Sequence, residues 1–110
     1  MLNQAVLVGR LVKEPELKKT DNGNSISNIT LAVPRSFKNS EGTYDTDFIS
    51  CVLWRGVAES TVNYCKKGDL VGIKGRVQTR KIESDDVVKH ITEVVAEKVT
   101  FLSSRKTDNN

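Results

Sequence analysis

The chain has little of several residue types that often carry chemistry or staple small folds. Its 110 residues include two cysteines, one histidine and one tryptophan. Two cysteines in a chain of this length do not make a disulfide framework, so we expect Cys51 and Cys65 to be free and to pack as small hydrophobic residues. The lone His90 has no cysteine or histidine at ligand spacing, so we expect no metal site and no cofactor.

Long hydrophobic runs are also absent. The longest, Ala5 to Val8, is stopped by Gly9 and is far too short to span a membrane. The N-terminus shows no secretory hydrophobic segment, so we expect a cytoplasmic protein that contacts no membrane. With 37% hydrophobic and 28% charged residues, the composition is that of one ordinary folded domain. We place this domain at residues 1–103 and expect a short disordered tail at 104–110.

The residue arrangements on which most enzymes depend are missing as well. There is no cysteine–histidine pair and no glycine-rich phosphate loop followed by a helix. Asp45 and Asp47 come nearest to a carboxylate pair, because period 2 places them on one side of a strand start. We interpret them as a solvated strand edge, and we predict a binding protein rather than an enzyme.

What the chain does contain is concentrated in the segment Asp47–Arg55. Successive side chains of a strand point to opposite faces, which sorts this segment into two rows. The first row is aliphatic and suits a core: Ile49, Cys51 and Leu53. The second row carries an aromatic at each end: Phe48, Ser50, Val52 and Trp54. Aromatic platforms on an open sheet favour stacking on unpaired bases, whereas a strand buried on both faces, as in a sandwich, is the alternative.

Charge is segregated along the chain although the net charge is only +3. The segment Lys66–Lys81 has six basic residues and one acidic residue, whereas Glu41–Cys65 has one basic residue and four acidic ones. A basic stripe of this kind is typical of a surface that binds a polyanion. Solvated strand faces also carry lysine and arginine, so the stripe alone does not decide the function.

The spacing of apolar residues predicts five strands and one helix. The strands are expected at Asn3–Val12, Ser25–Val33, Thr46–Trp54, Asp69–Arg80 and His90–Leu102. The helix is expected at Val57–Lys66, with Ala58, Val62 and Cys65 on one apolar face and Gly68 as its terminator. Pro34 should end the second strand, and Gly9 indicates a bulge or a close approach of two backbones.

Two polar segments connect these strands. Arg35–Asp45 is expected as a loop in which Phe37 lies between two bases, where it stacks on nucleobases or, alternatively, folds back onto the sheet. Lys81–Lys89 is expected as a hairpin. The order of elements is typical of an all-β protein with a five-stranded Greek-key barrel, the OB-fold, and one short helix between strands 3 and 4.

A set of short motifs also occurs in a fixed order along the chain. These are Leu7-Val8-Gly9-Arg10-Leu11, Glu14-Pro15-Glu16, Asn28-Ile29-Thr30-Leu31-Ala32, Asp47-Phe48-Ile49, Ala58-Glu59, Lys66-Lys67-Gly68, Gly75-Arg76-Val77-Gln78-Thr79-Arg80 and Thr92-Glu93-Val94. Over about residues 3–102 the chain closely resembles the bacterial single-stranded DNA-binding proteins of replication, recombination, repair and DNA uptake. The resemblance implies a nucleoid-associated homotetramer that wraps single-stranded DNA without strong sequence preference.

The resemblance also implies where DNA is contacted. The family's stacking positions fall on Phe37, Phe48, Trp54 and Ile82. Ile82 departs from the family, which usually has Trp or Tyr there, and it offers no π face. From the residues themselves we expect phosphate contacts by Arg10, Arg35, Lys38, Arg55, Lys74, Arg76, Arg80 and Lys81. Five of these are favoured because they lie on or beside the same face: Arg10, Arg35, Arg55, Arg76 and Arg80. Lys66 and Lys67 belong to the same basic pool or only cap the helix, and Lys13, Lys18 and Lys19 are expected to be solvated surface.

Two further departures lower what we expect of this chain. The hairpin segment Glu83-Ser84-Asp85-Asp86 lacks the usual tip glycine and carries three acids, so it should contribute less to DNA binding than in relatives. The chain also ends without the acidic tip and terminal phenylalanine of replicative members, so recruitment of enzymes through that tip is not expected. An OB module that serves protein assembly and binds nucleic acid weakly is the alternative function.

Overall fold

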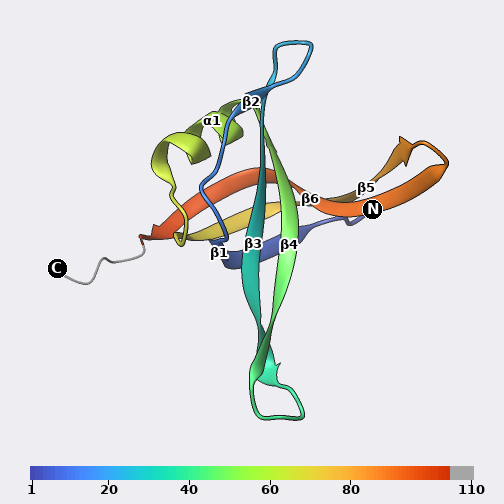
Figure 1. Cartoon of the computed structure of the whole chain (residues 1–110). Helices are drawn as coiled ribbons and strands as arrows, with labels where there is room; N and C mark the ends of the chain where they lie inside the picture. The colour runs from blue at the N-terminus through green and yellow to red at the C-terminus, as the bar shows by residue number, and fades with distance from the viewer. Residues whose placement is uncertain (105–110) are drawn as a thin grey trace.

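The chain folds into a strongly coiled barrel of strands with one helix at its end (Figure 1). The computed structural model describes residues 1–104. The elements in chain order are β1 (Ala5–Leu11), β2 (Lys18–Lys19), β3 (Ser25–Lys38), β4 (Tyr44–Trp54), α1 (Arg55–Tyr64), β5 (Leu70–Ser84) and β6 (Val87–Ser103). Apart from Ser104, the tail expected at 104–110 lies outside the described residues.

Strand pairing closes the sheet into a barrel. The strands are ordered β1-β5-β6-β4-β3-β2, and β1 also pairs with β3 at Arg10 and Leu11. The contact between β4 and β6 is parallel and short, and it places Val52 beside Val95. Because β2 has only two residues, five long strands make the barrel, and α1 lies between the third and fourth of them. This is the closed barrel with one helix that the sequence predicts.

The core is built from the inward rows of the strands and one side of α1. Leu31 and Val71 are fully buried, and the predicted inward row of β4 packs in the same core through Cys51 and Leu53, with Ile49 only partly buried. A Cβ atom built on Gly9 would lie 2.7 Å from the carbonyl oxygen of Ala32. The close backbone approach expected at Gly9 is therefore confirmed, and it lets β1 cross β3 where the barrel closes.

Two long hairpins extend beyond the barrel, one formed by β3 and β4 and the other by β5 and β6 (Figure 1). Both are longer than predicted. Pro34 does not end the second strand, because β3 continues to Lys38 and only residues 39–43 form the loop. Beyond Ala32, β3 pairs within residues 1–104 with β4 alone, and proline is tolerated on such an open edge. In the other hairpin the strands continue to Ser84 and resume at Val87.

The helix differs from the prediction at both ends. It runs from Arg55 to Tyr64, and Thr61 rather than Val62 completes the buried side with Ala58. The chain leaves the helix in extended conformation at Cys65, whose N–H donates to the Thr61 carbonyl. Gly68 does adopt the left-handed φ of 89°, but it does so in the turn before β5 rather than as the helix terminator.

Both cysteines are free and buried, as predicted. Burial raises the pKa of the Cys51 thiol to about 11, with a further contribution from the charge of Glu93. Burial also raises the pKa of Cys65, helped by the charge of Asp69. Because the thiolate is the reactive form, both side chains behave as the inert hydrophobic residues expected from the sequence.

Candidate nucleic-acid interface

One continuous outward face runs across β4, β6 and β5. On β4 it holds Phe48 and Trp54, in the same alternating row as Val52. Residues paired across strands share a face, so the face passes from Val52 to Val95 and from Val95 to Arg76. From Arg76 the same face continues along β5 through alternate residues: Gln78, Arg80 and Ile82. We call this surface the outer face.

The aromatic residues of the outer face lie open to solvent at both ends of the β4 row. Phe48 is 66% exposed and Trp54 is 38% exposed. This excludes the alternative of a strand buried on both faces at these two positions. The middle of the row is different, because Val52 is only 4% exposed and packs with Val95. The expectation of a largely solvated row is therefore wrong at Val52, where the β4–β6 contact covers the side chain.

The β3–β4 hairpin adds two more exposed aromatic side chains. Phe37 is 74% exposed, so it does not fold back onto the sheet. Tyr44 is 56% exposed and pairs with Lys38, whose Nζ lies 6.0 Å from the centroid of the tyrosine ring. Sequence reasoning missed Tyr44, although its period-2 spacing from Phe48 could have found it.

Basic side chains border the outer face on the side of β1 and β5. Arg10 lies opposite Ala32, and Ala32 in turn pairs with Phe48. The Nη1 atom of Arg10 donates to the Gly68 carbonyl at 2.9 Å. Lys74 lies in the same alternating row of β5 as Arg76. The register thus gathers Arg10, Lys74 and Arg76 near the aromatic row.

Arg80 lies on the outer face but is held by an acid. Its Nε donates to both carboxylate oxygens of Glu93 at 3.2 Å, and Gln78 donates to the same carboxylate at 2.8 Å. Glu93 is only 5% exposed. A buried carboxylate needs a cation and hydrogen-bond donors, since an uncompensated buried charge is strongly destabilising. Arg80 therefore has a structural task, which the sequence did not reveal.

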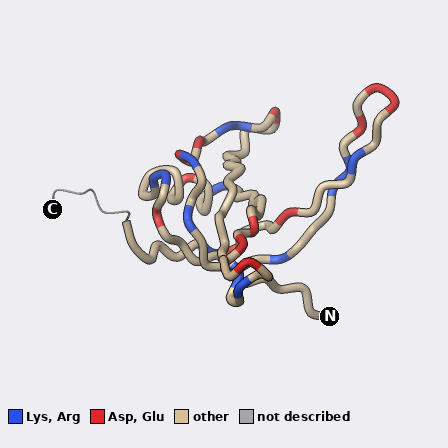
Figure 2. Tube along the Cα trace, turned by 60° about the horizontal axis from the view of Figure 1, so that its bottom comes forward, with Lys and Arg blue, Asp and Glu red and all other residues tan. Residues whose placement is uncertain are grey.

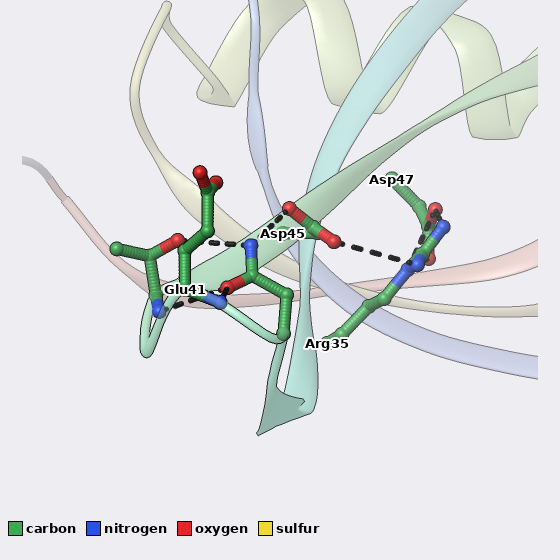
Figure 3. Close-up of polar contacts among 6 residues, drawn as sticks. Arg35, Glu41, Asp45 and Asp47 are labelled. Carbon is green, nitrogen blue, oxygen red and sulfur yellow. Dashed lines mark hydrogen bonds and ion pairs between the residues drawn. The ribbon is translucent and has the colours of Figure 1, made fainter.

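Arg35 and Lys81 lie off the outer face. Arg35 follows Val33 in the alternating row that pairs with Asp47, and this is the reverse side of the strand from Phe48. It forms ion pairs with Asp47 and Asp45 (Figure 3). The hydrogen bond from Arg35 and its charge hold the pKa of Asp47 below its usual range. Lys81 pairs with His90 in the opposite row to Ile82, and its Nζ lies 3.0 Å from Glu83.

Arg55 is set apart by its backbone. It begins α1 with a φ of 53°, directly after Trp54, which occupies the N-cap position in extended conformation. A bulky residue in the left-handed region costs about 1–3 kcal/mol, and such residues cluster at binding sites. Arg55 therefore combines an uncommon backbone conformation with a position directly after the exposed Trp54.

The tip of the β5–β6 hairpin is acidic. Figure 2 shows acidic positions at the end of this hairpin, with basic positions immediately behind them. The acids are Glu83, Asp85 and Asp86, and all residues from 81 to 90 are exposed. Ile82 lies in this hairpin on the outer face and is 37% exposed. The hairpin therefore offers an aliphatic contact next to negative charge.

Comparison with known proteins identifies the kind of protein that carries this surface. Residues 2–102 match the model of the family described as the single-strand binding protein family. The chain belongs to this family. It is 48% identical over 106 residues to the single-stranded DNA-binding protein B of Bacillus subtilis, covering 96% of this chain and 94% of that one. It is 51% identical over 107 residues to single-stranded DNA-binding protein 3 of Listeria innocua, with 96% and 67% covered.

The fold comparison agrees with the family. A crystal structure of a deletion mutant of the single-stranded DNA-binding protein from Thermus aquaticus matches with a TM-score of 0.78 at 29% identity, covering 94% of this chain and 52% of that one. The barrel is therefore the predicted OB-fold, and the family is one of binding proteins rather than enzymes. Within residues 1–104, no helix has the length and apolar character needed to cross a membrane.

Proposed function

We propose that this protein binds single-stranded DNA without strong sequence preference and protects it during replication, recombination, repair or DNA uptake. Its relatives are named for this activity. The observation that carries the proposal is that exposed Phe48 and Trp54 share one face with the basic side chains of β5. We place this activity in the cytoplasm, on DNA of the nucleoid.

Stacking supplies the part of binding that ignores sequence. Every base has a π face, and one base–aromatic stack contributes roughly 1–3 kcal/mol. We assign stacking to Phe37, Phe48 and Trp54, and add Tyr44 because it lies in the same row as Phe48. Ile82 packs against a base or sugar without stacking. The exposure of these side chains supports the assignment.

Phosphate contacts supply the salt-dependent part of the binding free energy, because each contact releases counterions from the DNA. Three of the eight predicted contacts are held by carboxylates in the free protein: Arg35, Arg80 and Lys81. We assign the phosphate contacts first to the other five: Arg10, Lys38, Arg55, Lys74 and Arg76. Arg80 keeps about half of its side chain exposed, so it contributes while it remains bound to Glu93.

We also propose that the working form is a homotetramer. The outward side of β1 presents Val6 and Val8, which are 70% and 50% exposed. Along Ala5–Gly9 the only partner of β1 within the described residues is β5, so this edge is open to another strand. Exposed apolar side chains beside an open strand edge are typical of an interface between protomers. Native mass measurement tests this assembly directly.

Titration with oligo-dT tests DNA binding, because Trp54 is the only tryptophan. Stacking should quench its fluorescence at low salt, and Trp54→Ala should weaken binding of a dye-labelled oligonucleotide. Tyr64→Ala is the control, since Tyr64 is an exposed aromatic side chain that lies on α1 and not in the strands of the outer face. Absence of both quenching and binding at low salt would sink the proposal and favour a module for protein assembly.

A further inference from the structure

Arg35 is enclosed by two carboxylates on the β3–β4 hairpin (Figure 3). The Nε atom of Arg35 lies 3.2 Å from both oxygens of Asp47, and its Nη2 lies 2.9 Å from Oδ1. On the other side, Nη1 lies 3.7 Å from Oδ2 of Asp45. Asp45 is itself fixed, because Asn39 in the hairpin loop donates to its Oδ1 at 3.0 Å.

This arrangement occupies one bidentate edge of the guanidinium and places a second carboxylate beside the other edge, although half of the Arg35 side chain stays exposed. An arginine grips an oxyanion through Nε with one terminal nitrogen, or through both terminal nitrogens. Asp47 takes the first edge and Asp45 faces the second. One guanidinium between two carboxylates gives the cluster a net charge of −1, so an approaching phosphate meets net repulsion.

The cluster also lies on a defined side of the hairpin. Arg35, Asp45 and Asp47 continue the row of Val33 and Ile49, which is the reverse side from Phe48. A DNA strand that stacks on Phe48 thus passes the hairpin on one side, and the cluster lies on the other side.

We propose that Asp45 and Asp47 are path-determining residues. They withhold Arg35 from phosphate, and so they keep the DNA backbone on the side of the hairpin that carries Phe48 and Tyr44. This rests on the DNA binding proposed above. Arg35 is then not one of the phosphate contacts expected from its charge. We call the cluster of Arg35, Asp45 and Asp47 the guard, because its net negative charge repels the DNA backbone.

A double-mutant cycle tests the guard. Affinity for oligo-dT is measured against salt concentration for the wild-type protein, Arg35→Gln, Asp45→Asn/Asp47→Asn and the triple variant. Removing both acids should tighten binding severalfold at low salt and steepen the log–log salt slope by roughly 0.7, the value for one added phosphate contact on single strands. Arg35→Gln should not tighten binding by itself, and in the triple variant it should remove the steepening of the salt slope.

The control is Glu41→Gln, which removes one negative charge from the same hairpin. In Figure 3 the Glu41 carboxylate lies apart from Arg35, and only its backbone N–H joins the network. Glu41→Gln should not gain the extra salt dependence. The guard is disproved if the asparagine variant binds more weakly, if Arg35→Gln weakens binding equally in both backgrounds, or if Glu41→Gln reproduces the gain.

Two further measurements distinguish failure of this proposal from loss of DNA binding and from unfolding of a variant. Wild-type binding at low salt is established first, so loss of the proposed DNA binding is seen independently of the guard. Thermal unfolding of each variant verifies that the barrel is intact, and Asp47→Asn alone serves if the double variant unfolds. Asparagine retains the side-chain oxygen that accepts the hydrogen bond from Asn39.

Discussion

The two hairpins that leave the barrel are both two-stranded arms, but their surface chemistry differs. The β3–β4 hairpin exposes Phe37, Tyr44 and Phe48, whereas the β5–β6 hairpin exposes Ile82, Val87 and Val88 beside an acidic tip. In an extended two-stranded arm both rows of side chains are exposed to solvent, because no core covers either face. The comparison teaches that two arms of similar backbone shape can offer different surfaces, and it is why we assign the proposed base stacking to the first hairpin and to Trp54.

The two hairpins also differ in the ion pair at their base. Arg35 and Asp47 form an exposed pair, whereas Arg80 is bound to the buried carboxylate of Glu93. An exposed pair contributes little to stability because water competes with it. A buried carboxylate depends on its partner. We therefore expect the Arg35 pair to matter little for stability and the Arg80 pair to matter more.

The largest effect should come from Phe48→Ala. Loss of one stacking platform should weaken binding of oligo-dT by roughly 1–3 kcal/mol, measured by anisotropy of a labelled oligonucleotide. Val88→Ala on the other hairpin is the control and should bind normally. Equal losses for the two variants would remove the distinction between the hairpins.

The next effect concerns stability rather than binding. Arg80→Ala leaves the Glu93 carboxylate without its cation and should reduce the free energy of unfolding in urea by about 1–3 kcal/mol. Arg35→Ala should leave unfolding nearly unchanged. Adding Glu93→Gln should recover part of the stability lost in Arg80→Ala, since the buried charge is then removed. Similar destabilisation by both arginine substitutions would contradict the contrast between the two ion pairs.

A smaller gain should follow from restoring an aromatic to the weaker hairpin. Ile82→Trp supplies a π face on the outer face and should tighten binding by roughly 1 kcal/mol. Val88→Trp adds the same ring on the opposite side of the hairpin, because Val88 pairs with Glu83, whereas Ile82 pairs with Lys89. Binding of oligo-dT should improve only for the first variant, and improvement in both would mean that side does not matter.

The smallest effect should come from neutralising the acidic tip. Glu83→Gln/Asp85→Asn/Asp86→Asn should tighten binding at low salt by a few tenths of a kcal/mol, and the gain should vanish at high salt as the charges are screened. Asparagine suits position 85, where φ is 50°, since it tolerates the left-handed region. A gain that persists at high salt would indicate a contact other than long-range repulsion.

Much of the fold could be predicted from local patterns. The alternation in β4 identified the inward row and the exposed Phe48 and Trp54, because period 2 is fixed by strand geometry. Turn and helix signals gave the order of elements, and Gly9 gave the close approach of two backbones. Strand ends were less accurate, since Pro34 and the polar residues beyond it are carried outward by cross-strand pairing that no local pattern records.

The sequence by itself determined which residues alternate, which segments form strands, and which side chains can stack on a base. Only the tertiary structure decided which charges are free. Arg35 and Arg80 look alike as sequence, but one meets the acids of a neighbouring strand and the other a buried glutamate that follows it by 13 residues. Charge neutralisation depends on distances between side chains of different strands, and strand register sets those distances only when the barrel closes.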